Sequence, residues 1–194
     1  MLRPTHLSGF RGRSIRQALA LDPVSPEFNV NASLAFLFAN ELDSVISRHR
    51  RSAEISSELA DFSAVMVGSA YALKGMYAQA ESTYKALDAR DPTQAGRNLA
   101  FGWLYARTGR RSEAVAIARR VEANWPKTYV APENIATVYA GLADRDRMYY
   151  WLDKGVAVRS GGAPYDAVMP WLRPYVHEAR FRALMKRIGI PDEP

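Results

Sequence analysis

A spacing of 34 residues constrains the fold of this chain more than any other feature of its sequence. The same five residue types (glycine, tyrosine, glycine, alanine and proline) occur twice in the same order, and every matching pair lies 34 positions apart. The two sets are Gly68, Tyr71, Gly75, Ala80 and Pro92, followed by Gly102, Tyr105, Gly109, Ala114 and Pro126. Tyr139 lies a further 34 positions after the second tyrosine. Such a period predicts an array of stacked structural repeats.

The order of the five residues predicts that each repeat is a pair of antiparallel α-helices. Glycine suits the left-handed residue that ends a helix, so Gly75 and Gly109 are expected in the turn between the two helices. Proline cannot continue a helix, so Pro92 and Pro126 are expected after the second one. One pair cannot bury its own apolar face, so the pairs must stack on one another. The sequence therefore predicts an all-α fold.

The repeat resembles the tetratricopeptide repeat, which has this period and this order of Gly-x-x-Tyr, Ala and Pro. The resemblance implies a right-handed superhelical solenoid of antiparallel helix hairpins that ends in a C-terminal capping helix. It also implies a non-catalytic scaffold for protein–protein interaction, which binds a peptide or a helix in its concave groove. The expected parts are an N-terminal helix (1–25), four hairpins (26–158) and a capping segment (159–194).

The outer repeats depart from the pattern. Asn40 stands where later repeats have the turn glycine, and asparagine tolerates the left-handed conformation better than most residues. Ala143 replaces the same glycine in the fourth hairpin. Leu21-Asp22-Pro23 resembles the end of a second repeat helix, so the chain is expected to begin inside a repeat. The N-terminal helix then either caps the array or continues from a longer protein.

Residues 129–191 resemble the closing segment of bacterial repeat arrays described as having a "TPR end-of-group" domain. The matching stretches include IATVYAGLADRD and ARFRAL, although this chain has Glu178-Ala179 where the group usually has Asp-Pro. Arrays of that group often follow a winged-helix DNA-binding domain, a nucleotide cyclase domain or a Ser/Thr kinase domain. The resemblance therefore implies an alternative function: a regulatory or sensor fragment of a larger bacterial signalling protein (transcriptional regulator, cyclase or kinase).

Composition and charge narrow the functional classes. The 194 residues are 48% hydrophobic and 24% charged, which is typical of one soluble domain. The sequence has no cysteine, which excludes disulfides and thiolate chemistry. Its apolar stretches are too short to span a bilayer and its start has no signal-peptide core, so we expect a cytoplasmic protein. The net charge of +6 comes from scattered arginines, which disfavours nucleic acid as partner.

Catalytic signals are absent from the sequence. It has no phosphate-binding loop, no dinucleotide fingerprint and no nucleophile elbow. The three histidines, His6, His49 and His177, are isolated, so the sequence predicts neither a metal site nor a cofactor. We expect a protein that is not an enzyme. A direct nucleic-acid binder and, ranked lowest, an unrecognised hydrolase are the rival hypotheses.

The binding surface is expected on the concave side, where the first helix of each hairpin lines the groove. Residues that face neither the partner helix nor the next repeat form its wall. The predicted wall residues are Val65, Ser69, Ala72, Leu73, Leu99, Trp103, Ala106 and Arg107, continuing to Glu133, Thr137 and Ala140. Trp and Arg dominate binding hot spots, so we expect a protein or peptide partner in this groove. The alternative is that the chain's own terminal segments cover Trp103. A homo-oligomer remains open.

Overall fold

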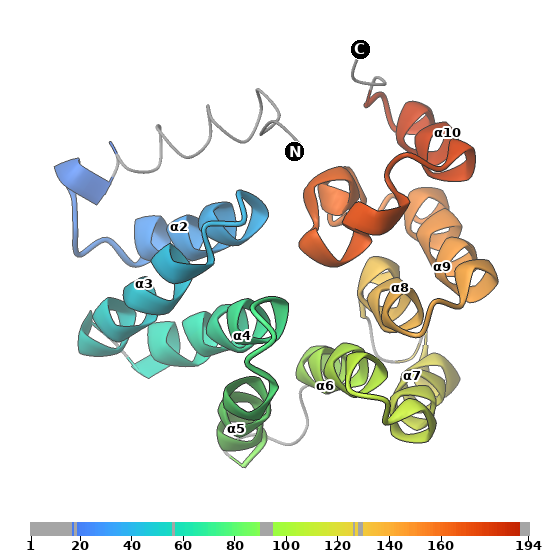
Figure 1. The fold of residues 1–194 in the computed structure, drawn as a ribbon. Coiled ribbons are helices and arrows are strands. Elements are labelled where there is room, and N and C mark those ends of the chain that lie inside the picture. Colours follow the sequence, from blue (N-terminus) through green and yellow to red (C-terminus); the bar gives the residue numbers. More distant parts are fainter. Residues whose placement is uncertain are drawn as a thin grey trace. The chain divides into compact units, whose positions relative to one another are not determined.

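The computed structural model describes residues 17, 19–55, 57–89, 95–125, 127 and 130–190. Every regular element in these ranges is a helix and none is a β-strand, so the all-α expectation is confirmed (Figure 1). Four of the predicted features lie outside the described residues: Pro92, Pro126, most of the N-terminal helix (1–16 and 18) and the last residues of the capping segment (191–194).

The chain divides into two compact units, of which the first is Met1–Asp91. Its helices are α2 (Pro26–Phe38), α3 (Leu42–Ile55), α4 (Ser57–Leu73) and α5 (Tyr77–Asp88). Helix α2 begins where Ser25 accepts a hydrogen bond from the Phe28 amide at 3.3 Å, with Pro26 in the first helical position. Each helix packs on the next one along the chain, and α2 also contacts α4. Leu37 and Val45 are fully buried in the core of this unit.

The second unit is Pro92–Pro194. Its elements are α6 (Ala95–Arg107), α7 (Arg111–Asn124), α8 (Pro132–Gly141), α9 (Arg145–Ala157), the 3₁₀ helices η1 (Ala163–Val168) and η2 (Pro170–Tyr175), and α10 (Ala179–Arg187). Helix α6 packs on α7 and α8, and α8 packs on α9. Ile135, Val138, Met148 and Leu172 are fully buried between these elements.

The 34-residue period is visible in the hydrogen bonds of the turns. The amide of the residue after Gly75 bonds the carbonyl of Tyr71 at 2.9 Å, and the equivalent bond to Tyr105 is also 2.9 Å. The third bond of the series, to Tyr139, is 3.0 Å long. The turn residues Gly75, Gly109 and Ala143 have φ of 77°, 81° and 57°, as this helix-ending motif requires. Asn40 has φ 61°, so its predicted left-handed conformation is confirmed.

The repeat glycines allow close helix packing, but not all within one hairpin. A Cβ atom added to Gly68 would overlap the ring of Tyr84 on the partner helix α5. A Cβ on Gly102 would lie 2.8 Å from Val138 Cγ2 on α8 and 3.4 Å from Ile117 Cγ2 on α7. Gly102 therefore permits the packing of α6 on the next helix pair as well as on its own partner.

The tail contains more structure than the sequence indicates. The sequence predicts a loop over Arg159–Pro164; in the structure η1 begins within this stretch at Ala163, η2 follows it, and η2 packs on α8. The sequence predicts an amphipathic capping helix over His177–Arg187, with Phe181, Leu184, Met185 and Ile188 on one side. Helix α10 packs on α9 and buries Phe181, Leu184 and Met185, but it begins at Ala179 and Ile188 lies just after its end.

Candidate functional site

The wall residues predicted on α4 belong to the first unit. Val65 and Leu73 are half-buried. The Ser69 hydroxyl donates a hydrogen bond to the carbonyl of Val65 at 3.0 Å and lies 3.1 Å from the Tyr84 hydroxyl on α5. Burial raises the pKa of Tyr84, so its hydroxyl stays protonated at neutral pH. Ser69 therefore faces the partner helix, whereas the repeat pattern predicts that it faces the groove.

The wall residues predicted on α6 belong to the second unit. Leu99 is buried, Trp103 is half-buried and Arg107 is exposed. A Cβ atom on Gly141 would lie 3.1 Å from Trp103 Cδ1, so the edge of the indole rests against α8. Burial raises the pKa of Tyr175 on η2, and the charges of Arg145 and Arg107 oppose that rise. Arg107 on α6 therefore lies close enough to η2 for its charge to lower the pKa of Tyr175.

The part of the wall predicted on α8 is covered by the tail of the chain. The Tyr175 hydroxyl on η2 donates a 2.8 Å hydrogen bond to the carbonyl of Ala140. Glu133, Thr137 and Ala140 are all buried. This agrees with the alternative that terminal segments occupy the groove, but only at α8. Trp103, Ala106 and Arg107 are the members of the predicted wall in this unit that are not buried.

A buried acidic pair on α8 and η1 was not found by sequence reasoning. Glu133 and Asp166 are each 1% exposed, and Ser160 donates a 2.6 Å hydrogen bond to Glu133 Oε1. Asp166 follows the stretch Arg159–Pro164, which the sequence predicts to be a loop, and nothing in its local pattern predicts burial. The one available signal was the run Ser160-Gly161-Gly162, because Gly162 leaves the space that the Glu133 carboxylate occupies.

A second polar cluster joins α7, α8 and α9 through Glu122. Its carboxylate accepts hydrogen bonds from the Tyr139 hydroxyl at 2.7 Å and from Trp151 Nε1 at 2.8 Å. Burial and the bond to Glu122 raise the pKa of Tyr139 to about 12, against the opposing effect of Arg147. Each donor of this cluster has an acceptor within it, so the cluster fastens three helices together and offers no reactive group.

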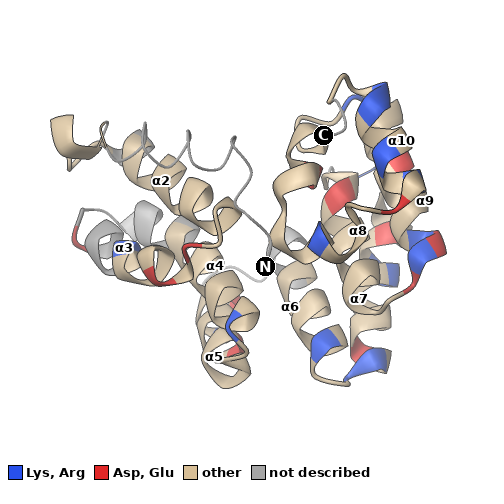
Figure 2. Cartoon of the chain, turned by 45° about the horizontal axis from the view of Figure 1, so that its top comes forward, with Lys and Arg blue, Asp and Glu red and all other residues tan. Residues whose placement is uncertain are grey.

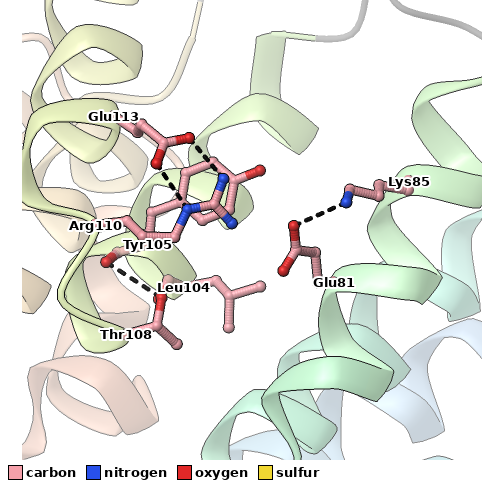
Figure 3. A network of polar contacts seen from close by, with 7 residues as sticks. All are labelled: Glu81, Lys85, Leu104, Tyr105, Thr108, Arg110 and Glu113. Carbon is pink, nitrogen blue, oxygen red and sulfur yellow. Dashed lines mark hydrogen bonds and ion pairs between the residues drawn. The ribbon is translucent and has the colours of Figure 1, made fainter.

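Several charged residues on the surface are paired with opposite charges. Arg110 donates two hydrogen bonds to Glu113, at 2.7 and 2.6 Å, and its guanidinium lies 3.6 Å from the centre of the Tyr105 ring (Figure 3). In the first unit, Lys85 pairs with Glu81 at 2.9 Å (Figure 3). Figure 2 shows basic and acidic residues interspersed over α9, whereas the charged residues of α10 are all basic. This surface does not form a single basic field.

Comparisons with known proteins were made with family models and with curated proteins. Neither comparison gives a match for this chain. The described helices include none with the length and apolar character of a membrane span. No group of three or more metal-binding side chains lies together within the described ranges. The class that the fold defines is an all-helical protein built from successive helix pairs.

Proposed function

We propose that this chain is a cytoplasmic, non-catalytic interaction module of the tetratricopeptide-repeat type. The observation that carries the proposal is the setting of Trp103, which rests on α8 at Gly141 and remains partly accessible. An indole held on one side and open on the other offers a large contact area at little entropic cost. Tryptophan and arginine are the residue types most enriched in binding hot spots, and Arg107 follows one helical turn later.

The geometry supports a smaller binding surface than the sequence predicts. The side chains of Ser69 and Leu99 are used in internal packing, and α8 is covered by η2. The surface that remains in the second unit is centred on Trp103 and Arg107. A helix or extended peptide with an apolar side chain beside a carboxylate matches these two groups, because the indole needs apolar contact and the guanidinium needs an acceptor.

An affinity pull-down with variants tests the proposal. The wild-type chain is compared with Trp103→Ala and Arg107→Glu, and with Arg119→Glu on the exposed side of α7 as a matched charge control. We expect the wild type and Arg119→Glu to capture the same proteins. Trp103→Ala and Arg107→Glu should no longer capture them. Loss of such an anchor commonly costs more than about 2 kcal/mol, roughly thirtyfold in affinity.

The melting temperatures of the same variants decide between binding and packing. If Trp103 is a binding residue, Trp103→Ala leaves the melting temperature close to that of the wild type. If it is a core residue, the substitution costs roughly 3–5 kcal/mol of stability. A strongly destabilised Trp103→Ala that still captures the same proteins would contradict the proposal.

A further inference from the structure

The buried carboxyl groups of Glu133 and Asp166 have fewer hydrogen-bond donors than such groups require. Ser160 bonds Glu133 Oε1 at 2.6 Å. Glu133 Oε2 and both carboxyl oxygens of Asp166 are buried and have no partner among the described residues. Buried polar atoms without partners destabilise a fold, and buried charges without partners do so more strongly. The pair therefore needs either a proton or a cation.

The surrounding backbone encloses the Glu133 carboxylate. A Cβ atom on Gly155 of α9 would lie 3.1 Å from Glu133 Oε2, and one on Gly162 would overlap the carboxylate. The two glycines therefore let α9 and the loop before η1 close over this group. Enclosure at this distance removes water that would otherwise solvate a second negative charge.

Basic groups on the neighbouring elements are engaged elsewhere. On α9, Arg145 pairs with Glu178 at 3.0 Å, and Lys154 lies 4.5 Å from the centre of the Trp125 ring. Arg147, also on α9, pairs with Glu122 of α7 at 3.4 Å. Arg173 on η2 and Arg107 on α6 are both exposed, and the charge of Arg107 lowers the pKa of Tyr175. Burial raises the pKa of Asp166 to about 8, the charge of Glu133 adds to the rise, and no basic group opposes it.

A proton explains this pair better than a metal ion does. No third carboxylate, histidine or cysteine of the described residues joins the two carboxyl groups. Hard divalent cations take six or more oxygen ligands, which this enclosed pair does not supply. Glu133 lies in the first turn of α8, and the helix N-terminus and the Ser160 hydroxyl both favour a negative charge there. The proton therefore belongs to Asp166.

We propose that Glu133 and Asp166 form a proton-controlled latch, which holds the segment 160–176 against α8 while Asp166 is protonated and releases it when Asp166 ionises. The segment contains η1 with Asp166 and η2 with Tyr175, whose hydroxyl is bonded to Ala140. Its release uncovers the Ala140 carbonyl on α8, beside the Trp103 surface. The latch itself rests on the packing alone, and only its effect on partner binding rests on the proposed function.

The direction of the pH dependence follows from proton counting. In the closed form Asp166 holds its proton up to a pKa of about 8. In the open form the carboxyl group is solvated and titrates near its ordinary value of about 4. Opening therefore releases one proton between these values, and the opening equilibrium constant rises about tenfold for each pH unit in that window. Acid favours the closed tail and alkali favours the open one.

Hydrogen–deuterium exchange of peptides from the segment 160–176 tests the latch without any partner. The full chain is measured at about pH 6, 7 and 8 in the presence of a chelator, and rates are corrected for intrinsic exchange. We expect protection of the wild-type segment to fall about tenfold per pH unit. Asp166→Asn, which keeps the shape and never ionises, should show protection that does not depend on pH. The control Asp146→Asn, at a fully exposed position of α9, should behave like the wild type.

Three outcomes would overturn the latch. The first is wild-type protection that does not change with pH, and the second is Asp166→Asn protection that changes as the wild type does. The third is recovery of protection at the highest pH on addition of Ca²⁺ or Mg²⁺, which would make the pair a cation site. Glu133→Gln provides a second variant if Asp166→Asn does not fold. Without the charge at position 133, ionisation of Asp166 is less unfavourable in the closed form, so this variant should open less than the wild type at the highest pH.

Discussion

Trp151 on α9 donates a hydrogen bond from Nε1 to Glu122 Oε1 on α7, with a distance of 2.8 Å. The same oxygen accepts a 2.7 Å bond from the Tyr139 hydroxyl on α8, and Arg147 donates to that hydroxyl at 2.9 Å. Glu122 is 20% exposed in its side chain, so these bonds form mostly out of water. One carboxylate thus joins helices of two successive hairpins, and it should contribute more to stability than a surface ion pair.

Replacement of Glu122 by alanine should destabilise the second unit by about 1–3 kcal/mol, because it leaves Tyr139 and Trp151 without their acceptor. Urea unfolding followed by circular dichroism measures the loss. Glu113→Ala, on the same helix, removes an exposed ion pair with Arg110 and should cost less than about 1 kcal/mol. Equal losses for the two variants would contradict a structural role for the Glu122 cluster.

Replacement of Ala143 by glycine should stabilise the chain. Ala143 is exposed and has φ 57°, a conformation that costs a residue with a Cβ atom roughly 1–2 kcal/mol. Glycine removes that cost and adds some entropy to the unfolded chain, so we expect a net gain of about 1 kcal/mol. Thermal unfolding should show a rise of about 2–4 °C.

Ala116→Gly is the matched control for this prediction. Ala116 is also exposed, but it lies within α7, where glycine is less favourable than alanine by roughly 0.5–1 kcal/mol. The same substitution should therefore have opposite signs at the two positions. Destabilisation at both would show that the turn at position 143 is not strained.

The parts of this fold that could be predicted from sequence are those set by local backbone chemistry. A turn that needs positive φ accepts few residue types, so the left-handed conformation of Gly75, Gly109 and Asn40 could be predicted from the sequence. The pairing of Glu133 with Ser160 could not, because their hydrogen bond joins positions 27 residues apart and depends on how the tail folds back. The direction of the Ser69 hydroxyl could not be predicted either, because it depends on the position of Tyr84 on the next helix.

Replacement of Gly102 by leucine should destabilise the second unit, because even a Cβ atom there would lie 2.8 Å from Val138 Cγ2. Overpacking of a close helix crossing typically costs roughly 1–3 kcal/mol. Gly161→Leu is the control, since a Cβ atom on Gly161 meets nothing within 4 Å. Thermal unfolding of both variants gives the comparison. Similar melting temperatures for the two would show that α6 and α8 do not pack as described.

Nucleic acid should bind this chain weakly and only at low salt. The net charge of +6 attracts phosphate, but Arg145 is bonded to Glu178 at 3.0 Å and Arg110 to Glu113 at 2.6 Å. A phosphate has to displace these carboxylates, and each contact that it gains makes binding more sensitive to salt. Fluorescence anisotropy with labelled single-stranded RNA and duplex DNA should show association at about 50 mM salt, and this association should be lost at about 200 mM salt. Sequence-selective binding that survives the higher salt would instead make the chain a nucleic-acid-binding protein.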